Sequence, residues 1–168
     1  MKITLVYPTF GMEKNPVQPF GVLYVAAALK KANFEVSIID TSLFSGFDVF
    51  EQALLREKPD VIGFTIPTWL LNNSYKAIKI TRRVMPHIPI LVGGPHPTIQ
   101  AEEMLESFGA DIACIGEAEI TAVELCEALK NKTGLQQVTG IVYRDGDRFV
   151  RTLPREKVKD LDTIAWPA

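Results

Sequence analysis

The alternation of short apolar runs with amphipathic helical runs is the feature that most constrains the fold of this chain. Strands are expected at 2–7, 35–40, 60–65, 89–92 and 111–115, and helices at 20–32, 49–57, 70–85, 99–108 and 120–130. Five strand–helix units joined by right-handed crossovers predict a parallel sheet with helices on both faces. The expected fold is therefore a doubly wound five-stranded α/β domain, flavodoxin-like or Rossmann-like, with strand order 2-1-3-4-5.

The chain changes character after residue 134. Segments 138–143 and 148–153 flank Asp145-Gly146, which predicts an antiparallel hairpin appended to the parallel sheet and closed by a type I′ turn. Residues 154–168 mix charged side chains with a late Trp-Pro pair, a composition typical of a linker. We therefore expect an α/β domain at 1–134, a hairpin at 135–153, and a linker at 154–168 that enters a further domain of a larger parent protein.

Composition and charge exclude several classes of function. The 168 residues carry 18 basic and 20 acidic side chains without clustering, so neither nucleic acid nor a membrane is expected as a partner. The N-terminal apolar run is too short for a signal peptide, and no run is long enough to span a bilayer, so export is not expected. Cys114 and Cys126 lack CxxC spacing and are interpreted as buried core thiols rather than metal ligands.

A glycine-rich loop after the fourth expected strand is the strongest sign of a ligand site. Gly93-Gly94-Pro95-His96-Pro97-Thr98 follows the apolar run 90–92. The paired glycines let a bulky ligand approach the backbone, and Thr98 is expected to cap the next helix, whose free N–H groups favour phosphate. Since ligands of doubly wound sheets bind outside the carboxyl ends of the strands, this loop predicts a site for a phosphate-bearing cofactor.

The other strand ends contribute further candidate residues at the same edge. The first loop, 8–21, is longer than such a connection needs, which suggests a segment that covers a ligand. Asp40, after the second strand, could bond a ribose hydroxyl or could equally form a turn or helix cap. Thr65 and Thr68 follow the third strand and could bond a ligand, although Thr68 could instead cap a helix. A glycine and two glutamates follow the fifth strand, and Glu119 stands where a helix dipole favours a carboxylate.

Absent motifs narrow the chemistry further. The chain has no G-x-G-x-x-G after the first strand and no G-x-x-x-x-G-K-[ST], which disfavours NAD and nucleoside triphosphate sites. It also lacks a G-x-S-x-G elbow, so a hydrolase triad is poorly supported. His87 is interpreted as a surface residue. His96 could be a general base or metal ligand, but a histidine between two prolines more often shapes a loop, so no catalytic or metal-binding residue is assigned.

Four segments, taken in order, resemble the N-terminal cobalamin-binding domain of the B12-dependent radical S-adenosylmethionine enzymes. They are PFGVLYVAA at 19–27, PDVIGFT at 59–65, GGPHPT at 93–98 and GEAE at 116–119. The resemblance runs nearly end to end, through VTGIVYR at 138–144 to Leu161-Asp162, after which that family continues into a catalytic barrel with a CxxxCxxC motif. The chain departs from the family at Ala118, where glycine is usual, and at 165–167, where a proline-rich run is more common.

The resemblance implies a function for the parent protein. This chain would hold cobalamin, while a C-terminal radical S-adenosylmethionine domain of the same parent chain would bind a [4Fe-4S] cluster and S-adenosylmethionine. The parent would be a methyltransferase or a cyclase of the anaerobic magnesium-protoporphyrin ester cyclase type, located in an anaerobic cytoplasm, and this chain alone would have no turnover. Because the first loop has no D-x-H-x-x-G motif, cobalamin is expected in its base-off form without a histidine below cobalt.

The resemblance also assigns cofactor-binding residues. The nucleotide tail would pass Gly93 and Gly94 near Thr65, and the corrin ring would lie over the first and third loops. The full expected set is Thr9, Phe10, Phe20, Gly21, Asp40, Thr65, Pro67, Thr68, Trp69, Gly93, Gly94, His96, Pro97, Thr98, Gly116, Glu117 and Glu119.

Two alternatives to cobalamin binding stay open at this point. The first is a flavodoxin-like or response-regulator-like module that uses the same edge for a flavin or a protein partner without B12. The chain lacks both the acidic pair of regulators and a Ser/Thr-rich phosphate loop after the first strand, which weighs against this alternative. The second is a scaffold that has lost its cofactor, and Ala118 gives that interpretation modest support.

Overall fold

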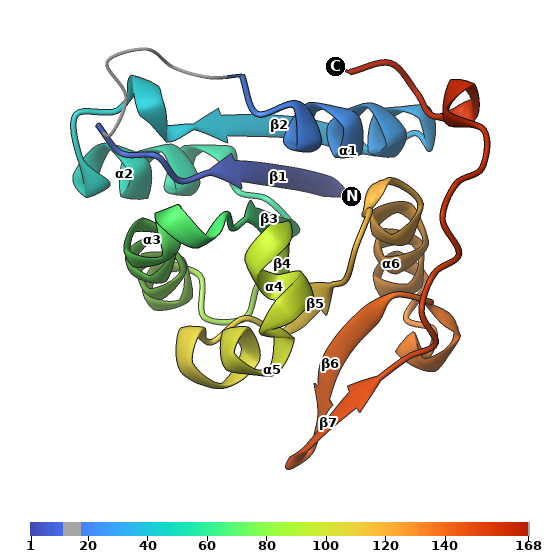
Figure 1. Ribbon diagram of the computed structural model, residues 1–168. Helices are drawn as coiled ribbons and strands as arrows, with labels where there is room; N and C mark the ends of the chain where they lie inside the picture. The colour runs from blue at the N-terminus through green and yellow to red at the C-terminus, as the bar shows by residue number, and fades with distance from the viewer. Residues whose placement is uncertain (12–17, 168) are drawn as a thin grey trace.

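A seven-stranded sheet forms the centre of the protein, for which a computed structural model describes residues 1–11 and 18–167 (Figure 1). Its order is β2-β1-β3-β4-β5-β6-β7, and the first five strands are parallel. The strands are β1 (Lys2–Tyr7), β2 (Glu35–Asp40), β3 (Val61–Thr65), β4 (Ile90–Gly93), β5 (Ile112–Cys114), β6 (Ile141–Asp145) and β7 (Arg148–Arg151). The predicted order 2-1-3-4-5 is thus confirmed.

The five predicted parallel strands and the predicted hairpin are present, but together they form a sheet of seven strands rather than five. The C-terminal hairpin continues the sheet, because β6 pairs antiparallel with β5, with Ile112 opposite Tyr143 and Cys114 opposite Ile141. The predicted turn is also displaced, since Asp145 pairs with Arg148 and the loop residues are Gly146 and Asp147. Only Gly146 of these two has a positive φ, of 60°, and this pattern is that of a type II′ turn rather than type I′.

Helices cover both faces of the sheet. Helices α1 (Phe20–Lys31) and α6 (Glu119–Asn131) pack together on one face, and α2 (Phe47–Glu57) and α3 (Leu71–Val84) cover the other (Figure 1). Between β4 and β5 lie α4 (Pro95–Ile99), α5 (Ala101–Glu103) and a π-helical turn, η3 (Met104–Phe108). Short 3₁₀ turns are η1 (Thr41–Leu43), η2 (Thr68–Leu70), η4 (Leu135–Gln137) and η5 (Leu161–Thr163). Within the described residues, none of the helices has the length and apolar character needed to cross a membrane.

The helical segment after β4 differs from the prediction. It begins at Pro95 rather than at residue 99, because proline suits the first turn of a helix and Gly94, with φ 98°, forms its N-cap. Thr98 therefore lies inside α4 and does not cap a helix as expected. Its hydroxyl donates to the Gly94 carbonyl at 2.9 Å and accepts from the Gly116 N–H at 3.0 Å, which joins the loops after β4 and β5.

Strand alternation divides the core into two clusters. On the α2 and α3 face, Phe50 and Leu54 pack with Ile62 and are fully buried. On the α1 and α6 face, Ile3 and Leu5 of β1 pack with residues of the two helices. Since successive strand side chains point to opposite faces, Ile3 and Leu5 share the α1 and α6 face with every second residue of the neighbouring strands.

The segment after β7 runs back along α6 (Figure 1). Arg155 donates its Nε to Thr121 Oγ1 at 2.7 Å and pairs with the carboxylate of Glu124. Farther along, residues 163–165 lie against α1 and α6 beside Ala28 and Ile120. The C-terminal segment is therefore fixed to the two helices of one face.

Arg82 at the end of α3 connects the starts of two strands. Its guanidinium donates to the carbonyls of Pro86 and Ile88 at 3.0 Å and of Gly109 at 3.1 Å, and to Asp111 Oδ2 at 2.7 Å. The neighbouring Arg83 bonds only one exposed carboxylate, that of Glu51, among the described residues.

We expect Arg82→Ala to lower the free energy of unfolding by about 2 kcal/mol, because several carbonyls and a carboxylate lose a charged donor. Arg83→Ala is the matched control and should cost no more than about 0.5 kcal/mol, since its pair is exposed. Urea denaturation followed by circular dichroism measures both, and equal losses would contradict the assigned role of Arg82.

Candidate cofactor site

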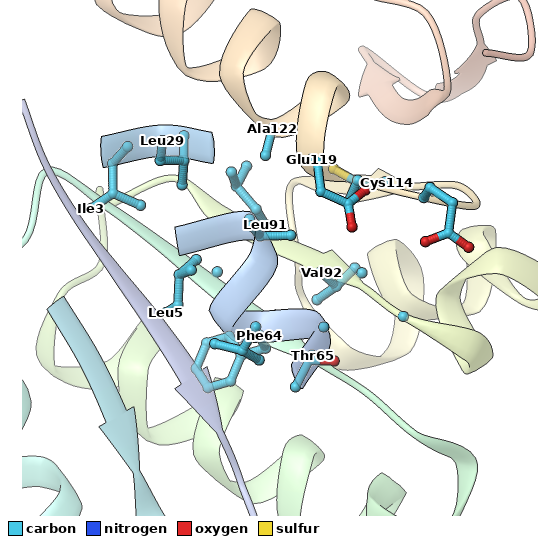
Figure 2. Close-up of a pocket in the computed structure, with 18 of the residues that line it drawn as sticks. Ile3, Leu5, Leu29, Phe64, Thr65, Leu91, Val92, Cys114, Glu119 and Ala122 are labelled. Carbon is cyan, nitrogen blue, oxygen red and sulfur yellow. The ribbon is translucent and has the colours of Figure 1, made fainter. Parts of the chain in front are cut away.

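A cleft of about 770 Å³, including its open mouth, lies between the sheet and helices α1 and α6 (Figure 2). Strands β1, β3, β4 and β5 form its floor, and the two helices form its walls. It extends to the loops after β4 and β5, at the carboxyl ends of the strands. The location agrees with the general rule for ligands of doubly wound sheets.

Two glycines hollow the floor of this cleft. Gly63 in β3 and Gly93 in β4 both line it, and the strand register places Gly93 beside Thr65. A Cβ at position 63 would lie 2.9 Å from Leu5 Cδ2, and one at position 93 would lie 3.7 Å from Cys114 Cβ. A side chain at position 63 would therefore displace Leu5, and one at position 93 would occupy space beside Cys114, so either change would narrow the cleft.

Gly94 is held in a conformation that favours glycine. Its φ is 98°, and a Cβ there would lie 3.0 Å from Thr65 Oγ1 and 3.3 Å from the Ile66 nitrogen. Hydrogen bonds on both sides fix this turn, from Ile66 N–H to the Gly93 carbonyl at 2.8 Å and from His96 N–H to the Ile66 carbonyl at 3.1 Å. The loops after β3 and β4 thus form one tightly packed rim.

The cleft is polar at its mouth and apolar at its deep end. Thr65 ends β3, and Glu117 and Glu119 follow β5, so these side chains lie at the carboxyl edge. Ile3 lies near the start of β1, and in Figure 2 it stands with Leu29 at the end of the cleft away from Thr65. A ligand with a polar part outside and an apolar part inside matches this arrangement.

Both cysteines line the cleft as neutral thiols. Cys114 and Cys126 are buried, as predicted, and burial raises the pKa of each to about 12. At neutral pH neither supplies the thiolate that binds metals. Among the described residues, no group of three or more His, Cys, Asp or Glu side chains is placed to hold a metal ion.

His96 joins two loops beside the cleft. Its Nδ1 lies 3.3 Å from Thr68 Oγ1, and its Nε2 lies 3.9 Å from the Glu103 carboxylate, too far for a hydrogen bond. Within the described part of the chain, the buried Nε2 has no hydrogen-bond partner, and the side chain is 12 % exposed. His87, in contrast, is exposed in the connection between α3 and β4, as predicted.

The structure brings seven of the expected site residues to the cleft. They are Gly21, Thr65, Gly93, Gly94, Gly116, Glu117 and Glu119. Other expected residues lie in the rim formed by the loops after β3 and β4, namely Pro67, Thr68, Trp69, His96, Pro97 and Thr98. The loop expected to cover the ligand includes residues 12–17, which lie outside the described residues.

The remaining expected residues lie elsewhere. Thr9 is fully buried, and its carbonyl accepts from Asn73 Nδ2 at 2.7 Å. Phe10 stacks on Phe47 with ring centroids 3.9 Å apart, on the α2 and α3 face. Asp40 accepts from the Ser42 N–H at 2.9 Å and caps η1, which is the alternative role considered for it. Phe20, the first residue of α1, is 57 % exposed.

Sequence reasoning missed most of the apolar lining. The missed residues are Ile3, Leu5, Val22, Val25, Leu29, Gly63, Phe64, Leu91, Val92, Cys114, Ala118, Ala122 and Cys126. One signal was present, since positions 119, 122 and 126 repeat at helical spacing with two small side chains among them. A glycine inside the apolar run of β3 was a second signal.

Comparison with known proteins identifies the family. An uncharacterized methyltransferase of Pyrococcus horikoshii is 30 % identical over 100 % of this chain and 38 % of its own length. The anaerobic magnesium-protoporphyrin IX monomethyl ester cyclase of Cereibacter sphaeroides is 28 % identical over 98 % of this chain and 28 % of its own length. The chain thus spans only about a third of these relatives.

A solved structure has the same fold. It is the radical S-adenosylmethionine methyltransferase TsrM of Kitasatospora setae with cobalamin and a [4Fe-4S] cluster bound. It matches with a TM-score of 0.80 and 21 % identity, over 99 % of this chain and 31 % of that one. The family model of the B12 binding domain matches residues 13–126. This chain therefore belongs to the B12-binding domain family, whose cofactor is cobalamin.

Proposed function

We propose that this chain is the cobalamin-binding domain of a B12-dependent radical S-adenosylmethionine enzyme and holds the nucleotide tail of cobalamin in the cleft beneath α1 and α6. The observation that carries the proposal is the glycine-hollowed cleft, which opens at the carboxyl edge of the sheet. Cobalamin has a corrin ring with polar amide side chains, a phosphoribosyl linker and a largely apolar dimethylbenzimidazole. The cleft is polar at its mouth, where the corrin ring and the linker would lie, and apolar at its deep end, where the base would lie.

The mouth supplies groups for the polar linker. Thr65 Oγ1 is a donor and acceptor, and the carboxylates of Glu117 and Glu119 can accept from ribose hydroxyls and from the amide side chains of the corrin. These carboxylates would repel the phosphate itself, so the phosphate would lie nearer to Gly93 and Gly94, where backbone approach is closest. Ala118 lies between the two glutamates and also lines the cleft.

The rim provides a surface for the corrin ring. Trp69 is 56 % exposed in η2, and Thr68 beside it bonds His96, so the loop after β3 is held to the loop after β4. In this proposal Pro67, Thr68 and Trp69 contact the ring. Thr9 and Phe10 are packed inward and would support the first loop rather than touch the cofactor.

We further propose that cobalamin is bound base-off and without a histidine below cobalt. His87 lies where the chain enters β4, at the opposite edge of the sheet from the mouth. His96 is at the right edge, but its ring is mostly buried and its Nδ1 contacts Thr68. This proposal agrees with the absence of a D-x-H-x-x-G motif from the sequence.

The reaction belongs to the parent protein. The relatives are methyltransferases and cyclases about three times as long as this chain, so we propose that a C-terminal domain of the parent binds a [4Fe-4S] cluster and S-adenosylmethionine. We propose the same division that the sequence predicts, with a cofactor domain at 1–134, a hairpin at 135–153 and a linker at 154–168 that leads to this further domain. The anchoring of Arg155 on α6 would fix the direction in which the linker leaves.

Replacing Gly94 by valine should weaken cobalamin binding at least about 10-fold, because the new side chain would press on Thr65 and close the rim. The measurement is a titration with hydroxocobalamin, with bound stoichiometry scored after desalting. Gly146→Val is the matched control, since Gly146 also has a positive φ but lies in the hairpin turn with nothing within 4 Å of its added Cβ. Unchanged affinity of Gly94→Val would contradict the proposed site.

Replacing His96 by glutamine should leave the axial ligation of bound cobalamin unchanged. The expected electron paramagnetic resonance spectrum of the cobalt(II) form lacks nitrogen splitting in both proteins, because neither a histidine nor the displaced base binds the lower face. Nitrogen splitting that disappears in His96→Gln would overturn the proposal and identify His96 as the ligand. Splitting that persists in the variant would show base-on binding.

A further inference from the structure

We infer that the cleft selects among corrinoids by their lower base and prefers an apolar benzimidazole to adenine. The inference rests on the proposed function, since it requires the base to enter the cleft. It concerns a property of the deep end alone, so it can fail while cobalamin binding stands. The corrin ring and the linker are the same in the two kinds of corrinoid.

Aliphatic side chains enclose the deep end. Ile3 and Leu5 of β1 and Leu91 of β4 point to this face of the sheet, and Leu29 of α1 stands over them (Figure 2). On the α6 side the wall is made by Ala122, whose small side chain leaves room for a flat bicyclic ring. The methyl groups of dimethylbenzimidazole would make apolar contacts here, and the burial of each methyl group would favour binding.

The same region offers few partners for a purine. The strands that form the floor use their backbone N–H and C=O groups in ladders with their neighbours. Among the described residues that line the cleft, the side chains with oxygen atoms are Thr65, Glu117 and Glu119, all at the mouth. The two thiols are protonated and form only weak hydrogen bonds.

Adenine would therefore bind at a disadvantage. Its amino group and ring nitrogens are hydrogen-bonded to water in solution, and at the deep end they would lose that water without gaining a partner. Dimethylbenzimidazole has no amino group and a single free ring nitrogen when it is displaced from cobalt, so it gives up fewer hydrogen bonds to water than adenine does. A pocket of this kind is expected to bind two corrinoids that differ only in this base with affinities about 10- to 100-fold apart.

Three ligands that share the corrin ring test the inference on the full-length protein. Cobalamin, a corrinoid with adenine as its lower base, and cobinamide, which has no nucleotide tail, are titrated in parallel. We expect cobalamin to bind most tightly and the adenine corrinoid about 10- to 100-fold more weakly. Equal binding of cobalamin and the adenine corrinoid, with cobinamide weaker than both, would overturn the inference and leave the proposed function standing. Equal binding of all three would overturn the inference and also the proposed placement of the nucleotide tail, because the base would not enter the cleft.

A variant locates the source of the discrimination. Cys126→Ser is close in size and places a hydroxyl on the α6 wall of the cleft, so the preference for cobalamin over the adenine corrinoid should fall about 3- to 10-fold. Ala128→Ser is the control, because Ala128 is also buried on α6 but does not line the cleft. An unchanged preference in Cys126→Ser, or an equal change in Ala128→Ser, would show that the apolar deep end does not set the selection.

Discussion

The packing of α1 and α6 over strands that carry glycine is the constraint on which the site depends. A parallel sheet must be covered on both faces, so helices lie close above β3 and β4. At Gly63 and Gly93 the sheet offers no side chain to fill the layer between sheet and helix. A cleft results between the sheet and these helices, and it opens at the edge where the loops can contact a ligand.

The two faces of the sheet differ for this reason. The α2 and α3 face is filled by large side chains such as Phe50 and Leu54, and Phe10 stacks on Phe47 at its border. The α1 and α6 face has small residues on α6, which leaves space next to the sheet. Both faces carry a packed core that holds the strands, but only the α1 and α6 face also leaves room for a cofactor.

The C-terminal part of the chain is coupled to the same helices. β6 extends the sheet beyond β5, and Arg155 binds Thr121 and Glu124 on α6, the helix that walls the cleft. Residues 163–165 then lie across α1 and α6, and Glu119 borders both this contact and the cleft. The C-terminal segment and the cleft therefore share the same two helices.

The sequence by itself determined the alternating strands and helices, the order of the five parallel strands, the glycine loop and the family. These depend on local periodicity and on short motifs, and both can be recognised in consecutive residues of the sequence. Only the tertiary structure decided that the hairpin pairs with β5 and in which register, and that α4 begins at Pro95. It also decided that Thr9 and Phe10 point into the core while Ile3, Leu29 and Ala122 line the cleft. Those outcomes depend on which faces of segments far apart in the chain meet. The cleft in particular forms where small residues or glycines from several such segments come together.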